Sequence, residues 1–251
     1  MCWLYIGFMV RAVHRMRALK NPSGLMRALL KCLSKKQFFF TTGVVETAKV
    51  EALTEKFVRL YPTIAESSSY RSAMRKTRQP VVDLFWWPLT PRGSWEFVLI
   101  SDQRLPKEPK MQDARRRNQR ITVLNGYYQC VRKPGDGWTW EMTDEHFAWW
   151  HRQLMRAVSK EDPQLVIDTA NRMRRVVSMY KGARIQVLHL LGEAQRACKT
   201  KGKRDVKIPM SVPIMRFLPV YSNCSLHEQI LSIKRETVDQ RSREQSQPSF
   251  S

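Results

Sequence analysis

The stretch PGDGWTWEMTDEHFAWWHRQL, residues 134–154, contains the point at which the chain changes from a strand pattern to a helix pattern. Its first part is a glycine-rich turn followed by GWTWEM, where tryptophans alternate with other residues as in a β-strand. Thr143 then precedes two acidic residues, the arrangement expected of an N-cap and the first turn of an α-helix. We therefore expect a helix from Asp144 to about Ser159, with strands before it and further helices after it.

The region before this point, residues 37–142, has the pattern of a mainly antiparallel sheet with one packed helix. QFFFTTGVV is rich in β-branched and aromatic residues and predicts a strand. ETAKVEALTEKFVRLYP predicts a helix that ends before Pro62. The apolar face of this helix consists of Val50, Leu53, Phe57 and Leu60. After a polar, basic connection, SSSYRSAMRKTRQ, two hairpins are expected, one around TPRG and one around PGDG.

Residues 143–222 predict three helices rich in arginine and lysine, closed by an extended segment. The second helix should begin at Pro163 and end at Gly182, and its apolar stripe consists of Val166, Ala170, Met173, Val177 and Tyr180. The third helix precedes the basic loop TKGKRD and carries on one face Val187, Leu190, Leu191, Ala194 and Cys198. The closing segment contains three prolines and can form at best an edge strand. A short helix and a disordered tail complete the chain over residues 223–251.

The N-terminal residues 1–36 contain eight cations and no Asp or Glu, and predict one or two short basic helices interrupted at NPSG. Three interpretations fit this segment: an arm that lies on nucleic acid, which we favour, a mitochondrial presequence, or a start codon assigned too far upstream. The whole chain thus predicts an α+β fold. It comprises an N-terminal basic helical arm, a mainly antiparallel sheet with one packed helix, and a C-terminal three-helix basic segment.

The net charge of the chain indicates which class of partner it binds. The 251 residues include 44 Lys+Arg against 22 Asp+Glu, a formal charge of +22. Such an excess is explained most simply by a polyanionic partner, nucleic acid in preference to an anionic membrane surface. No apolar run approaches the roughly 20 residues of a membrane span. The five scattered cysteines are odd in number and lack a CxxC pair, which favours a reducing compartment. We expect the bacterial cytoplasm, with the mitochondrial matrix as the alternative.

Three clusters of cations are the candidate phosphate contacts, because guanidinium groups donate in pairs to phosphate oxygens. The first, DARRRNQR, is expected in a loop between two strands and contains Arg115, Arg116, Arg117 and Arg120. The second lies on the helix after Pro163 and in the following turn, with Arg172, Arg174, Arg175, Lys181 and Arg184. The third ends the last long helix, with Lys199, Lys201, Lys203 and Arg204. A run of charge is often only a solvated face, but three runs with few acids favour binding.

The two adjacent tryptophans of the opening stretch should have different roles. Trp150 has core spacing with Phe147, Leu154 and Ala157. Trp149 lies about 100° around the helix, in line with Arg152 and Arg156. An aromatic ring on such a face can stack on an unpaired base. Trp149, Arg152 and Arg156 are therefore candidate nucleic-acid contacts, whereas Trp138 and Trp140 share one face of their strand and are either core or stacking surface.

No local motif indicates a cofactor, a metal or a catalytic residue. The phosphate-binding patterns GxxxxGK[ST] and GxGxxG are absent. His146 and His151 lie about 140° apart around a helix and cannot bind one ion from a single face. Tyr127 and Tyr128 resemble paired strand-cleaving nucleophiles, which also need a metal held by a histidine pair. Because that pair is missing, we expect one tyrosine ring inside the strand's core and one outside.

We predict a binding protein rather than an enzyme, for single-stranded or structured RNA or DNA. It would act with other protein subunits in a nucleoprotein complex, in mobile-element replication or transfer or in RNA–protein assembly. Helix-turn-helix and zinc-finger spacings are absent, which disfavours reading of duplex DNA. One alternative is a metal-independent endoribonuclease, in which His146 or His151 beside Arg152 promotes attack by the 2′-hydroxyl. The other is a structural subunit of an organellar ribonucleoprotein.

Overall fold

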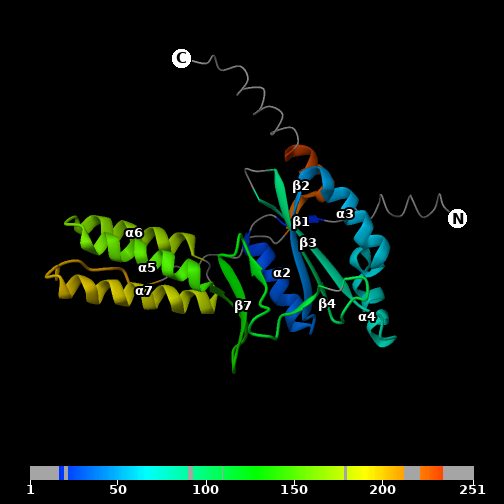
Figure 1. Ribbon diagram of the computed structural model, residues 1–251, viewed down its shortest axis with the longest axis horizontal. Helices are drawn as coiled ribbons and strands as arrows, with labels where there is room; N and C mark the ends of the chain where they lie inside the picture. The colour runs from blue at the N-terminus through cyan, green and yellow to red at the C-terminus, as the bar shows by residue number, and fades with distance from the viewer. Residues whose placement is uncertain are drawn as a thin grey trace, which may run out of the picture. The chain divides into compact units, whose positions relative to one another are not determined.

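The computed structural model describes residues 17–19, 22–89, 93–108, 110–177, 180–211 and 221–233. Helices and antiparallel sheets both contribute to it, so the predicted α+β class is confirmed (Figure 1). The chain forms two compact units, one made of Met1–Ala114 with Leu218–Ser251 and the other of Arg115–Phe217. Predictions for residues 1–16, 212–220 and 234–251 lie outside the described residues.

The first unit is built on a four-stranded antiparallel sheet of order β3-β4-β2-β5 (Figure 1). Its strands are β2 (Phe39–Glu46), β3 (Val82–Leu89), β4 (Ser94–Ser101) and β5 (Gln112–Asp113). The predicted hairpin of β3 and β4 is present, with Val82 opposite Ser101 and Leu89 opposite Ser94. Pro88, which cannot donate to a ladder, lies in the edge strand β3. A separate two-stranded sheet pairs β1 (Arg17–Leu19) with β9 (Tyr221–Ser225).

Helices of the first unit complete its core. The predicted helix is α3 (Thr47–Leu60), which buries Val50 and Phe57 and is followed by the 3₁₀ turn η1 (Pro62–Ala65). These side chains cluster with Trp95 and Leu99 of the sheet and with Leu226 and Ile230 of the C-terminal helical residues. Within the segment expected as an arm, α2 (Pro22–Ser34) buries apolar side chains that belong to this unit, namely Leu25, Met26, Leu29 and Leu33.

The polar, basic connection after η1 is partly helical, which we did not predict. It contains helix α4 (Ser68–Lys76), whose N-cap Ser67 accepts a hydrogen bond from the backbone N–H of Tyr70. Arg71 on this helix forms an ion pair with Asp83 of β3. None of the residues of α4 is buried. The segment is mostly polar, so it gives only a weak version of the apolar pattern from which a helix is predicted.

The second unit joins a small sheet to three helices (Figure 1). The sheet has the order β6-β7-β8, with β6 (Thr122–Val123), β7 (Tyr128–Lys133) and β8 (Gly137–Met142). The helices are α5 (Asp144–Ser159), α6 (Pro163–Val176) and α7 (Lys181–Thr200). The predicted N-cap is confirmed, because the side chain of Thr143 accepts from the backbone N–H of His146. All members of the two predicted apolar stripes on α6 and α7 are buried, including the flanking Val177 and Tyr180.

The segment before PGDG, RITVLNGYYQCVRK, contains two strands, β6 and β7, where the predicted hairpin needs only one. Leu124, Asn125 and Gly126 all have positive φ angles, of 58°, 56° and 78°. The chain reverses there, so that β6 and β7 pair with each other, Thr122 lying opposite Gln129. Left-handed backbone is common for Gly and tolerated by Asn, which is why this turn can form at an Asn-Gly pair.

We predicted that the second helix ends at Gly182, and this prediction is wrong. Helix α6 ends at Val176, and Gly182 lies in the first turn of α7. A Cβ at this position would lie 2.7 Å from the backbone oxygen of Trp140 and 2.6 Å from Cγ of Glu141. Glycine is therefore needed for close packing of α7 on β8 and not for a left-handed helix end.

Hydrogen bonds also join α7 to β8. The Gln186 side chain accepts from the backbone N–H of Met142 at 2.6 Å and donates to its carbonyl at 3.1 Å. The backbone N–H of Gly182 donates to the hydroxyl of Thr139 at 3.1 Å. These contacts attach the second hairpin to the helices, so the two units divide between Ala114 and Arg115 and not at the predicted boundary after residue 142.

Candidate nucleic-acid interface

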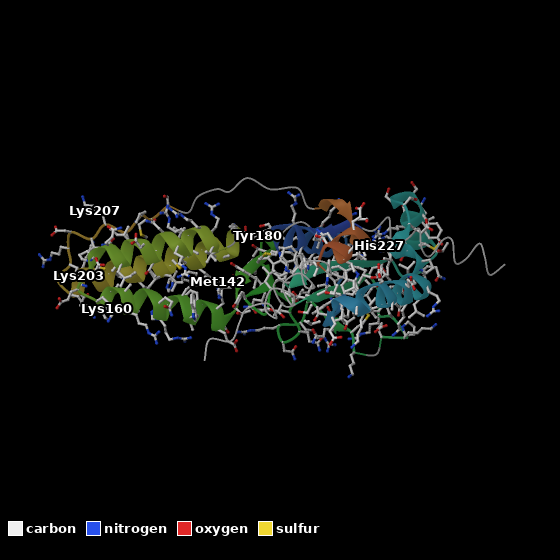
Figure 2. The ribbon with its side chains drawn as sticks, turned by 90° about the horizontal axis from the view of Figure 1, so that it is seen from above. Met142, Lys160, Tyr180, Lys203, Lys207 and His227 are labelled. Atoms are coloured by element: carbon white, nitrogen blue, oxygen red, sulfur yellow. The ribbon has the colours of Figure 1, made fainter. Side chains whose placement is uncertain are left out.

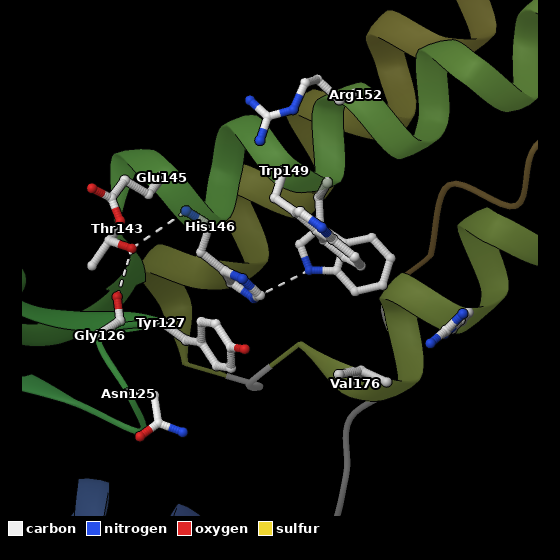
Figure 3. A pocket seen from close by; sticks show the side chains of 11 residues that line it. Asn125, Gly126, Tyr127, Thr143, Glu145, His146, Trp149, Arg152 and Val176 are labelled. Carbon is white, nitrogen blue, oxygen red and sulfur yellow. Dashed lines mark hydrogen bonds between the residues drawn. The ribbon is translucent and has the colours of Figure 1, made fainter.

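A pocket of about 440 Å³ lies within the second unit, between the β6–β7 turn, the first turns of α5 and the last turns of α6 (Figure 3). The turn contributes Asn125, Gly126 and Tyr127. A larger group comes from α5 and its N-cap, namely Thr143, Glu145, His146, Trp149, Trp150 and Arg152. Helix α6 contributes Arg172 and Val176. The volume falls within the range of pockets that hold small molecules.

Three aromatic rings form a row along the wall of this pocket. The ring centroids of Tyr127 and His146 are 4.6 Å apart with an interplanar angle of 28°. The rings of His146 and Trp149 are 6.2 Å apart and nearly parallel, at 6°. Tyr127 is 51% exposed and Trp149 is 38% exposed. The two outer rings of the row are therefore accessible to a planar ligand. The exposure of Trp149 agrees with its expected place on the outer face of the helix.

The central ring of the row, the imidazole of His146, is held by a hydrogen bond. The indole Nε1 of Trp150 donates to Nε2 of His146 at 3.2 Å, so the neutral imidazole carries its proton on Nδ1. Burial lowers the pKa of His146, which favours this neutral form. The hydroxyl of Thr143 donates to the carbonyl of Gly126 at 2.7 Å and links the turn to the start of α5. These contacts orient the imidazole and join the turn that carries Tyr127 to the start of α5.

Two arginines give the pocket its charge. Arg152 of α5 and Arg172 of α6 both line it and are both exposed. Within the described part of the chain, neither forms a hydrogen bond or an ion pair with a protein group. Glu145 also lines the pocket and is its acidic residue. Two guanidinium groups against one carboxylate leave a positive site that can attract an anion.

The structure places the other predicted arginines on the surface of the second unit without bringing them to the pocket. Arg156 is exposed one turn beyond Arg152 on α5, and Arg175 is exposed on α6. Arg184 is half-buried on α7. The predicted loop before β6 is present, with Arg120 half-buried and with three exposed side chains, those of Arg115, Arg116 and Arg117.

Several of the predicted cations have protein partners. Arg174 donates through Nε to the carbonyl of Ser211 at 2.5 Å and through Nη1 to Oδ1 of Asn171 at 2.8 Å. Lys181 pairs with Asp136 at 2.5 Å. Both are tied into the second unit and also help to hold it together.

The lysines after α7 bind the end of α5. Lys203 Nζ donates to the carbonyl of Val158 at 2.9 Å and also to the carbonyl of Lys160. Lys201 Nζ donates to the hydroxyl of Ser159 at 2.9 Å. Lysine near a helix C-terminus satisfies carbonyls that have no partner within the helix. Figure 2 shows Lys203 and Lys160 at the opposite end of the helices from Met142 and Tyr180. This cluster, with the exposed Lys199 and Arg204, is therefore remote from the pocket.

Sequence reasoning missed the parts of the pocket that depend on tertiary packing. Tyr127 and Tyr128 point as expected, one exposed and the other buried, but the stacking of Tyr127 on His146 was not anticipated. The Asn-Gly pair before Tyr127 is the signal from which the turn could have been found. Val176 was not predicted either, and no local pattern marks it. Of the strand tryptophans, Trp140 is fully buried and Trp138 half-buried.

The described ranges contain no group of three or more His, Cys, Asp or Glu side chains that could hold a metal ion. Among the helices of the same ranges, none is long and apolar enough to cross a membrane. No protein-family model, curated protein or solved structure matches the chain.

Proposed function

We propose that the second unit binds single-stranded or unpaired nucleic acid, with Trp149 stacked on a base and with Arg152 and Arg172 at neighbouring phosphates. A single observation carries this proposal: an exposed tryptophan, aligned with a row of fixed rings, lines the same pocket as two arginines. Stacking on an aromatic side chain contributes about 1–3 kcal/mol per base and tolerates any sequence. Arginine donates in pairs to phosphate oxygens.

The remaining charge supports contacts outside the pocket. The net charge of +22 favours a nucleic acid over a neutral ligand, and the exposed Arg116, Arg117 and Arg156 extend the positive surface. Phosphate contacts of this kind supply affinity that does not depend on sequence. The charge exceeds what one small pocket can use, so we expect a strand that extends beyond the pocket. Further protein subunits in a nucleoprotein complex remain part of the proposal.

The endoribonuclease alternative is less well supported at His146. A general base must offer a free lone pair to the 2′-hydroxyl of the substrate. Nε2 of His146 already accepts a hydrogen bond from Trp150, and its ring stacks with that of Tyr127 at a centroid distance of 4.6 Å. We therefore favour binding over cleavage. A structural role in an organellar ribonucleoprotein stays an alternative prediction, since it requires the same contacts with RNA.

The experiment is a fluorescence anisotropy titration of the full chain against labelled single-stranded RNA, single-stranded DNA and duplex DNA. We expect the single strands to bind more tightly than the duplex, and log Kobs to fall linearly with log salt concentration between about 50 and 300 mM. A slope near zero would contradict the role of phosphate contacts. Labelled RNA recovered intact after incubation with EDTA would support a binder, and cleaved RNA would support the ribonuclease.

A further inference from the structure

The pocket has a volume of about 440 Å³ and is lined by both aromatic rings and two arginines. Resting on the proposed function, we infer that it holds a single unstacked purine nucleotide, with the base on the aromatic row and the adjoining phosphate between Arg152 and Arg172. Proteins that read an unstacked base commonly place it in a pocket between aromatic or apolar side chains. The occupant would be a terminal or bulged nucleotide of the bound strand.

The size and walls of the pocket fit a base. The cavity volume of about 440 Å³ lies within the range of pockets that hold small molecules. One wall is the row of Tyr127, His146 and Trp149 (Figure 3). Trp150 holds the ring of His146 by a hydrogen bond, and Thr143 joins the turn before Tyr127 to α5. Helix α6 adds Val176, an apolar side chain that is 61% exposed. A purine offers the larger face to such a row, so we expect purines to bind more tightly than pyrimidines.

The charges of the pocket favour a nucleotide over the other ligands that aromatic pockets hold. Rings beside a carboxylate can bind a quaternary ammonium group by cation–π attraction. Here Glu145 is outnumbered by Arg152 and Arg172, which repel a cation and attract an anion. An anion without a ring, such as inorganic phosphate, would leave the aromatic wall in contact with water. A ligand that combines a planar ring with a phosphate satisfies both features.

The test measures binding of adenosine monophosphate, uridine monophosphate, adenosine and inorganic phosphate to the full chain by isothermal titration calorimetry. We expect adenosine monophosphate to bind with one-to-one stoichiometry, and each of the other three to bind at least about tenfold more weakly. Arg172→Gln should weaken the binding of adenosine monophosphate toward that of adenosine, because only Arg152 then contacts the phosphate, and should leave the binding of adenosine unchanged. Arg196→Gln, which removes the same charge from an exposed position on α7, is the matched control and should change neither.

The outcomes separate this inference from the proposed function. If labelled oligonucleotides bind but adenosine monophosphate does not, the nucleotide site is wrong and the proposed function stands. If neither binds, both fail. Adenosine binding as tightly as its monophosphate would contradict the role of the arginines, and phosphate binding as tightly would reduce the site to a general anion site. Either result would overturn the inference.

Discussion

Trp149 and Trp150 are neighbours in the chain, yet one lies at the surface and the other in the core. Their ring centroids are 4.7 Å apart at an interplanar angle of 81°. Trp150 is 3% exposed and Trp149 is 38% exposed. A step of one residue turns a side chain about 100° around a helix, so adjacent residues of α5 can serve the core and the pocket. The two residues therefore allow stability and binding to be tested separately.

Replacement of Trp150 should destabilise the protein strongly. Trp150→Ala empties a large core site and removes the donor to His146, and should lower the free energy of unfolding by about 3–5 kcal/mol. Trp149→Ala removes a ring that is partly in solvent and should leave the free energy of unfolding nearly unchanged. Chemical denaturation of the two variants checks this. If Trp149→Ala unfolds the protein while Trp150→Ala is tolerated, the assignment of the two rings is wrong.

The close approach of α7 to β8 makes Gly182 sensitive to a single methyl group. Gly182→Ala would place its Cβ against the backbone oxygen of Trp140, and such overpacking costs about 1–3 kcal/mol. Gly192, also in α7, is the matched control because the nearest atoms to a Cβ there are 3.9 Å away. Gly192→Ala should stabilise the helix by up to about 1 kcal/mol. Equal melting temperatures for the two variants would argue against this packing.

The stability of the second unit should depend on pH through His146. Burial lowers the pKa of this imidazole in the folded protein, whereas an unfolded histidine has a pKa of about 6.5. Between these two values the unfolded chain binds the proton and the folded chain does not, so stability falls as the pH drops through that window. Above pH of about 6.5 both states are neutral and the effect is absent.

Urea denaturation at pH of about 7.5 and 5.5 measures this effect. The comparison is with His146→Gln, which cannot titrate but can still accept from Trp150. The wild type should lose more stability than the variant on acidification. An equal loss in both proteins would show that other groups cause it.

The loop before β6 should contribute to affinity but not to stability. Arg116 and Arg117 are exposed there, and surface substitutions rarely change stability by more than about 0.5 kcal/mol. Replacing both with Ala should weaken binding of a single strand and reduce its salt slope by about 1.4, the value for two lost phosphate contacts. A variant with Arg196→Ala and Lys207→Ala removes the same charge elsewhere as a control. A large fall in melting temperature would show instead that the loop arginines are structural.

Local sequence patterns predicted much of the fold. The N-cap at Thr143, the hairpins and the buried stripes of α6 and α7 follow from periodicity and turn residues, and the structure contains them. Helix α4 was missed because it buries no residue and most of its residues are polar. Gly182 was misread because its role comes from a contact with β8, about 40 residues earlier in the chain.

The pocket could be predicted only in part. The phase of α5 indicated that Trp149 and Arg152 share an exposed face. It could not indicate that Tyr127 and His146 complete a row of rings, because Tyr127 comes from a turn between two strands. Nor could charge alone separate Arg172, which faces the pocket, from Lys203, which binds the carbonyls at the end of α5. These distinctions depend on how distant segments pack.

One measurement tests the central claim most directly: the affinity of the full chain for a labelled single strand of about 12 nucleotides. It is compared for the wild type, Trp149→Ala and Trp149→Phe. Trp149→Ala should bind the strand more weakly by about 1–3 kcal/mol, roughly 5- to 150-fold in Kd, because the stacking of one base is lost. Trp149→Phe should keep most of the affinity, and the salt slope should not change, since no phosphate contact is lost. An affinity of Trp149→Ala within about twofold of the wild type would contradict the claim that this tryptophan binds a base.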